Sequence, residues 1–230
     1  MELLNQDVRA ATKKKFDDEL VNKVTILLFT QEPGLLILPC QGLGQECQFC
    51  RETRQLLQEV TALSDKLELE VLDFAAQKEK AVAYGVDKIP AMVILAEGDT
   101  RIRFFGVPSG YEYTCVVEAI IDASKRSTGL SPQTLAALEA LDKDVHIQVF
   151  VTPTCPFCPL AVRLAHQMAM ASAHVRGDMV EAIEFPQVVQ RYGIRGVPKT
   201  LMNETVSLEG APTEDVFLAH VLEAGGHGQT

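Results

Sequence analysis

Four of the six cysteines in this 230-residue chain form two pairs, each with two residues between the cysteines: Cys47 with Cys50, and Cys155 with Cys158. Each pair follows an apolar, strand-like stretch and precedes a helical pattern. The thiolate is the reactive species in disulfide exchange, and a helix N-terminus lowers a cysteine's pKa through its free N–H groups and its dipole. We therefore expect Cys47 and Cys155 to attack disulfides, and Cys50 and Cys158 to resolve the mixed disulfides.

A proline stands 43 residues after the first cysteine of each pair, and a Tyr-Gly pair precedes each proline at the same distance. An X-Pro bond can be cis at modest cost. We predict cis bonds at Ile89-Pro90 and Val197-Pro198, whose backbone groups would bind an incoming peptide as an added strand. The alternative is that both prolines are trans and simply open strands. The matched spacing indicates two copies of one unit, offset by 108 residues.

The elements that must position these residues follow the same order in both copies. The first copy is expected to form strand 24–30, helix 51–67, strand 69–74, helix 78–84, a hairpin of 91–95 and 101–105, and helix 111–124. The second is expected to form strand 145–151, helix 160–174, strand 180–185, a helix ending at 192, a hairpin within 200–208, and helix 214–224. Further helices are expected over 5–20 and over 131–141, the latter capped by Ser131. We place the boundary between units 1–127 and 128–230.

The first copy carries an insertion, residues 31–46, between its strand and its cysteine pair. Long loops beside chemistry are usually functional. Cys40 lies in it, either as a free thiol or paired with an active cysteine or with Cys115. On its helix Cys115 lies opposite the apolar face, so we expect it to be partly exposed or at an interface, and not in the core. The second copy has a short loop, which favours Cys155 and Cys158 as the main centre. Phe49 and Phe157, between the cysteines, should shape a substrate groove and remain partly exposed.

Charge and composition narrow the class of protein. The net charge is −10 and the pI about 5.0, which argue against nucleic acid or an anionic membrane as a partner. No apolar run approaches the length of a membrane span, and the start lacks the features of a secretory signal. Cysteine pairs in such a chain are expected to be catalytic or metal-binding in a reducing cytoplasm.

Zinc is the main alternative for paired cysteines, and it would make the chain a metal-binding or scaffold module with non-catalytic pairs. Zinc ribbons usually separate their pairs by roughly 15–20 residues, unlike the spacing here, so we expect no metal site. No glycine-rich GxGxxG stretch follows a strand, which argues against a bound nucleotide.

The strand-CxxC-helix and Tyr-Gly-x-x-x-x-Pro pattern, present twice, resembles the thioredoxin fold. The tandem arrangement, which covers nearly the whole chain, is similar to the protein disulfide oxidoreductases, glutaredoxin-like proteins made of two thioredoxin units. The resemblance implies an α/β fold in which each unit has a central mixed sheet flanked by helices. The sequence Cys155-Pro156-Phe157-Cys158 is close to the glutaredoxin motif, while Cys47-Gln48-Phe49-Cys50 departs from it at the second position.

The resemblance also implies an activity: dithiol–disulfide exchange with protein disulfides, with a thioredoxin-reductase-type flavoenzyme as electron donor. The redox-active disulfides Cys47–Cys50 and Cys155–Cys158 would then be the only redox groups, without a further cofactor. Tandem thioredoxin units also occur as adaptors in flavoenzyme-coupled peroxide reduction, which is a third interpretation. One departure concerns proton transfer. The first strands, 25–30 and 146–152, hold no carboxylate of the kind that accepts a proton in thioredoxins, so water or another group must take this role.

Overall fold

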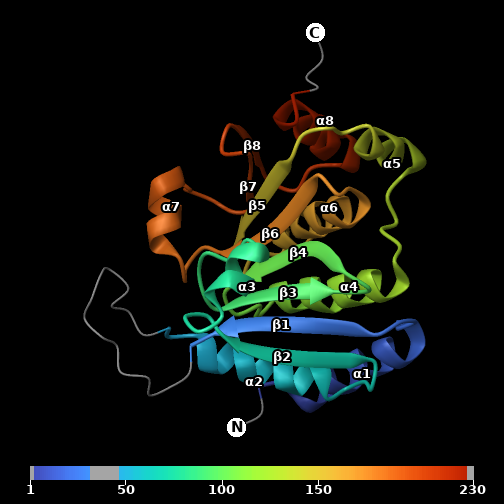
Figure 1. Ribbon diagram of the computed structural model, residues 1–230, viewed down its shortest axis with the longest axis vertical. Coiled ribbons are helices and arrows are strands. Elements are labelled where there is room, and N and C mark those ends of the chain that lie inside the picture. Colours follow the sequence, from blue (N-terminus) through green and yellow to red (C-terminus); the bar gives the residue numbers. More distant parts are fainter. Residues whose placement is uncertain (1–2, 32–46, 227–230) are drawn as a thin grey trace.

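The computed structural model describes residues 3–31 and 47–226. Its core is one continuous eight-stranded sheet in the order β2-β1-β3-β4-β6-β5-β7-β8 (Figure 1). The first half of the chain contributes β1 (Val24–Thr30), β2 (Leu67–Asp73), β3 (Ala91–Leu95) and β4 (Asp99–Phe105). The second half contributes β5 (Val145–Val151), β6 (Val175–Glu181), β7 (Lys199–Met202) and β8 (Val206–Glu209).

Each half has the same strand pairing. The first strand pairs in parallel with the second and antiparallel with the third, and a hairpin adds the fourth. This is the mixed sheet with flanking helices that the sequence predicts. The two halves meet where β4 lies parallel to β6, with Ile102 opposite Gly177 and Phe105 opposite Val180. The division of the chain between residues 127 and 128 stays a prediction, because the strands of both halves belong to one sheet.

Helices cover both faces of the sheet. In chain order they are α1 (Gln6–Glu19), α2 (Cys50–Thr61), α3 (Lys78–Ala83), α4 (Glu112–Lys125), α5 (Pro132–Glu139), α6 (Cys158–Ala171), α7 (Pro186–Tyr192) and α8 (Glu214–Ala224). The larger core packs α1, α2, α4, α5, α6 and α8 against one face, whereas the smaller core on the other face lies under α3 and α7 (Figure 1). The predicted Ser131 cap is confirmed: its hydroxyl accepts a hydrogen bond from the N–H of Thr134 at 3.2 Å.

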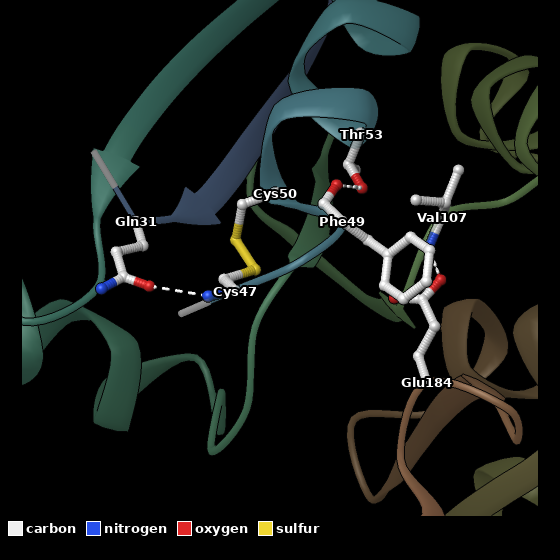
Figure 2. Close-up of a disulfide and its surroundings, with 7 residues drawn as sticks. All are labelled: Gln31, Cys47, Phe49, Cys50, Thr53, Val107 and Glu184. Carbon is white, nitrogen blue, oxygen red and sulfur yellow. Dashed lines mark hydrogen bonds between the residues drawn. A yellow bond between two sulfur atoms is a disulfide. The ribbon is translucent and has the colours of Figure 1, made fainter. Parts of the chain in front are cut away.

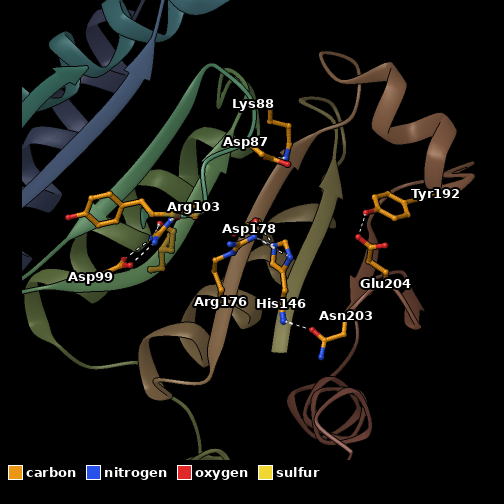
Figure 3. Close-up of polar contacts among 12 residues, drawn as sticks. Asp87, Lys88, Asp99, Arg103, His146, Arg176, Asp178, Tyr192, Asn203 and Glu204 are labelled. Carbon is orange, nitrogen blue, oxygen red and sulfur yellow. Dashed lines mark hydrogen bonds and ion pairs between the residues drawn. The ribbon is translucent and has the colours of Figure 1, made fainter. Parts of the chain in front are cut away.

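The second strand of the second half lies about five residues earlier than predicted, at Val175–Glu181 instead of 180–185. The sequence did not predict a strand here because the charged residues Arg176 and Asp178 interrupt the apolar pattern that is typical of a buried strand. They point to the α3 and α7 face, where Asp178 contacts His146 at 2.5 Å and Arg176 at 3.1 Å (Figure 3). Nearby, the buried Arg103 of β4 pairs with Asp99 at 2.6 Å. Paired charges thus occupy the sheet beside the junction of the two halves.

The helix after the second cysteine pair lies very close to β6. A Cβ atom at Gly177 would lie 2.6 Å from the carbonyl oxygen of Ala165. A glycine is therefore required at this position of the strand, since any side chain would push α6 away from the sheet. This close packing fixes the helix that carries Cys158.

Candidate redox centres

The second cysteine pair lies at the start of α6, after the strand β5, as the sequence predicts. Cys155 and Cys158 form a disulfide, with their Cα atoms 5.5 Å apart. Cys158 is the first residue of α6 and is fully buried, while Cys155 is 9% exposed in the turn before it. The N–H of Cys158 donates to the Sγ atom of Cys155 at 3.2 Å. A free helix N–H group thus reaches the sulfur that is predicted to attack as a thiolate.

The first pair has the same arrangement at the start of α2. Cys47 and Cys50 form a disulfide, again with Cα atoms 5.5 Å apart, and Cys50 is 3% exposed (Figure 2). The N–H of Cys47 donates to the side-chain oxygen of Gln31 at 2.9 Å. Gln31 directly follows β1, so this bond fixes Cys47 beside the end of that strand. The predicted insertion and Cys40 lie outside the described residues, apart from Gln31.

Both predicted cis bonds are confirmed: Ile89-Pro90 and Val197-Pro198 are cis. The two turns also match in detail. The carbonyl oxygen of Pro90 accepts from Gly106 at 3.0 Å, and that of Pro198 accepts from Gly210 at 2.9 Å. Each proline is buried just before its strand, and the residue before it is half-buried. That these residues bind substrate remains a prediction.

The phenylalanines between the cysteines differ in their surroundings. Phe157 is 62% exposed, as expected for a groove residue, and Tyr111, Leu160 and Ile183 are also largely exposed. Phe49 is half-buried and its ring is directed toward Val107 and Glu184 (Figure 2). Glu184 belongs to the second half of the chain. The side chain between the first pair of cysteines is therefore directed toward the other unit, whereas the one between the second pair is exposed.

The first strands hold no proton acceptor, but the structure has three carboxyl groups with raised pKa values near the junction. Glu112 is completely buried, and neither of its oxygens makes a well-formed hydrogen bond with the described residues. Burial raises its pKa to about 9, and the charges of Glu181 and Glu184 add to this. Burial likewise raises the pKa of Glu184 to about 7, and it also raises the pKa of Glu181.

Glu112 directly follows a residue that contacts the loop before the second cysteine pair. It opens α4, and the N–H of the preceding Tyr111 donates to the carbonyl oxygen of Pro153 at 3.0 Å, two residues before Cys155. The strand sequences could not reveal Glu112, because the acid comes from the last helix of the first unit. One feature of the sequence could have indicated it: Glu112 is a glutamate in the first turn of the last helix of the first unit.

Cys115 lies in the larger core, at the contact of α4 with α6, so the prediction that it is outside the core is wrong. It is 5% exposed, and burial raises its pKa to about 12. Glu118 and Asp122 mark the polar side of α4, but this side faces α6 instead of solvent. Arg163 of α6 pairs with both carboxylates, and its Nη2 lies 3.1 Å from Asp122. A cavity of about 330 Å³ remains between the two helices, with Cys115 in its wall.

Metal-binding and membrane-spanning features are both absent from residues 3–31 and 47–226. In those ranges no three or more His, Cys, Asp or Glu side chains are grouped so that they could hold a metal ion. No helix in the same ranges combines the length and apolar character needed to cross a membrane.

Comparison with known proteins points to one group. A thioredoxin domain model matches residues 145–223. The F component of alkyl hydroperoxide reductase from Xanthomonas campestris pv. phaseoli is 24% identical over 74% of this chain, and an NADH dehydrogenase from Bacillus subtilis is 22% identical over 71%. The chain spans about 30% of the length of each of these two relatives.

Two solved structures match almost the whole chain. A protein disulfide oxidoreductase from Aeropyrum pernix is 28% identical with a TM-score of 0.86, and the match covers 98% of this chain and 95% of that one. The alkylhydroperoxide reductase component AhpF from Enterococcus faecalis is 27% identical with a TM-score of 0.83, over 95% and 99% of the two chains. The chain, with its two disulfide-bonded CxxC pairs, therefore has the tandem thioredoxin fold and is similar over nearly its whole length to these two redox proteins.

Proposed function

We propose that the protein reduces disulfides of partner proteins, with Cys155 and Cys158 as its main catalytic pair. The observation that carries this assignment is the hydrogen bond from the N–H of Cys158 to Sγ of Cys155. It stabilises a thiolate at the less buried of the two sulfurs. The exposed side chains of Phe157, Leu160 and Tyr111 give an apolar partner segment a surface next to that sulfur.

The reaction has two exchange steps. The Cys155 thiolate attacks one sulfur of the partner's disulfide, forms a mixed disulfide, and releases the other partner sulfur as a thiolate that takes up a proton. The Cys158 thiol then loses its proton and attacks Sγ of Cys155. This forms the Cys155–Cys158 disulfide and releases the second partner thiol. The cis turn at Val197-Pro198 would hold the partner's backbone during both steps.

Glu112 supports the second step as an acid–base group. A buried carboxyl near the start of α6 can take up the Cys158 proton and return one in the next cycle, which replaces the strand carboxylate that is missing here. Its raised pKa of about 9 keeps it protonated in the resting oxidised enzyme at neutral pH. It gives this proton to the Cys158 thiolate that is released when the Cys155–Cys158 disulfide is reduced, and takes it back from the Cys158 thiol in the second step. For the first unit we propose the same attacking and resolving roles for Cys47 and Cys50, next to the turn at Ile89-Pro90.

The electrons come, in this proposal, from a thioredoxin-reductase-type flavoenzyme in the cytoplasm, without a cofactor beyond the two disulfides. A second candidate function is that of an electron adaptor for a peroxide-reducing partner. It is favoured by the matches to the F component of alkyl hydroperoxide reductase, one of which covers 99% of a solved chain. Because this chain spans less than a third of the first curated relatives, their whole activity is not transferred.

Reduction of insulin by dithiothreitol tests the assignment. We expect the wild-type protein to accelerate it, and Cys155→Ser with Cys158→Ser to remove most of this acceleration. Cys47→Ser with Cys50→Ser is the matched control and should retain most of it. Full activity after the first double substitution would contradict the assignment to the second centre. Turnover of peroxide only when a flavoenzyme, this protein and a peroxiredoxin are all present would support the adaptor role.

A further inference from the structure

The two units contact each other's redox centres reciprocally. The first unit places Tyr111 against Pro153, beside the second centre, where Glu112 also lies. The second unit places Glu184 near Phe49, the residue between the cysteines of the first centre (Figure 2). The contact at the first centre has no counterpart in a single thioredoxin unit, because Glu184 comes from the other half of the chain.

The carboxyl group of Glu184 is held in one place. Its Oε1 accepts the N–H of Val107 at 2.7 Å, and its own N–H donates to Glu181 at 2.7 Å. A Cβ atom at Gly106 would lie 3.0 Å from Oε1, so the loop leaves no room for a side chain there. The Oε2 atom is buried and makes no hydrogen bond with the described residues. A buried carboxyl oxygen without a hydrogen-bond partner is unusual in a folded protein and calls for an explanation.

Two carboxylates raise the pKa of Glu184 by their charge: Glu181 at the end of β6 and Glu52 in the first turn of α2. The charge of Glu184 in turn raises the pKa of Glu112 at the start of α4. Glu52 belongs to α2, the helix that carries Cys50. The charge of Glu184 therefore interacts with a charge on the first redox helix. Burial and these like charges raise the pKa of Glu184 to about 7. The group therefore changes its charge within the physiological pH range.

Phe49 links this carboxyl to the redox turn. Its carbonyl oxygen accepts both the N–H of Thr53 at 2.9 Å and the hydroxyl of Thr53 at 2.8 Å. Its backbone therefore starts α2, while its side chain is directed toward Glu184 and Val107 (Figure 2). A displacement of the ring would shift the helix N-terminus that faces Cys47.

We infer that Glu184 is a positioning residue for the first redox centre, through which the second unit sets the reactivity of Cys47 by way of Phe49. When Glu184 is neutral, the ring packs against it and the first turn of α2 stays in place. When Glu184 is ionised, its negative charge disfavours the Cys47 thiolate and the apolar contact weakens. This inference rests on the proposed attacking role of Cys47.

The test is the pH dependence of Cys47 alkylation by iodoacetamide in the fully reduced protein, followed by mass spectrometry of its peptide between pH 5 and 9. In the wild type we expect a second inflection near pH 7, besides that of the thiol itself, with a change in rate of about two- to tenfold, as expected when one nearby group changes its charge. Glu184→Gln should remove the inflection, because the amide can still accept from Val107 but cannot ionise. Phe49→Ala should weaken it, because only the direct effect of the Glu184 charge then remains.

Two controls make the result specific. Glu79→Gln removes an exposed carboxyl of α3, and Phe157→Ala removes the matching ring of the second centre. Both should keep the inflection at Cys47. A single-inflection profile in the wild type, or an unchanged profile in Glu184→Gln, would overturn the inference. Alkylation needs no turnover, so a failure here is distinguishable from a failure of insulin reduction.

Discussion

The N–H of Tyr111 donates a hydrogen bond to the carbonyl oxygen of Pro153 at 3.0 Å. This bond joins the last loop of the first unit to the turn that carries Cys155. It also fixes the start of α4, and with it the buried carboxyl of Glu112. The second redox centre is therefore built by both halves of the chain, and substitutions in the first half should affect it.

Gly110, directly before Tyr111, gives the first prediction. It has a φ of +57°, and a Cβ atom there would lie 2.2 Å from the oxygen of Pro153. Gly193 has a similar φ of +60° with no atom within 4 Å. Gly193→Ala should therefore cost about 1–2 kcal/mol of unfolding free energy from backbone strain alone. Gly110→Ala should cost clearly more, because the loop must also move.

Urea unfolding of both variants measures this difference, and alkylation of reduced Cys155 reports on the second centre. We expect Gly110→Ala to change the Cys155 rate and Gly193→Ala to leave it near the wild-type value. Equal losses of stability in the two variants would show that the contact with Pro153 relaxes without cost.

The second prediction concerns the pH dependence of stability. The folded-state pKa of Glu112 is raised to about 9 from an ordinary value of 4.5. The folded protein therefore holds this proton more tightly than the unfolded chain. The associated stability is fully present below pH 4.5 and is lost as the pH rises toward 9, at up to about 1.4 kcal/mol per pH unit for one proton.

Glu112→Gln cannot ionise and should flatten this decline, so the variant should exceed the wild type in unfolding free energy at pH 8.5 but not at pH 5. Urea unfolding at both pH values measures the effect, and Glu79→Gln serves as the exposed control. Glu181 and Glu184 also have raised pKa values, so part of the decline should remain. Parallel pH curves for the variant and the wild type would refute the prediction.

The third prediction is that Cys115 is inert in the folded protein. A pKa of about 12, against an ordinary value of 9.0, leaves on the order of 10³ times less thiolate at pH 8 than an exposed thiol would have. Iodoacetamide should modify its peptide only after unfolding in urea. The reduced Cys155 in the same sample is the positive control, and labelling of native Cys115 at the unfolded rate would contradict the buried position.

Local patterns in the sequence predicted the redox turns well. The cysteine pairs, the helices they open and the two cis bonds all depend on residues close together or repeated at a constant spacing. The parallel contact of β4 with β6 could not be predicted, since no local pattern tells which outer strands will meet. That contact explains the errors. The position of β6 was predicted wrongly because its polar residues line the junction, where Arg176 lies next to Gly85 of the first half. The position of Cys115 was predicted wrongly because α6 covers the polar side of α4.

The continuity of the sheet sets a limit on how the protein can be divided. A chain cut between the two halves would unpair β4 from β6 and leave each fragment with a bare strand edge of free N–H and C=O groups. Such edges recruit other strands, so isolated fragments should self-associate and precipitate instead of acting as small independent reductases. Any engineered minimal version must therefore keep both halves or redesign that edge.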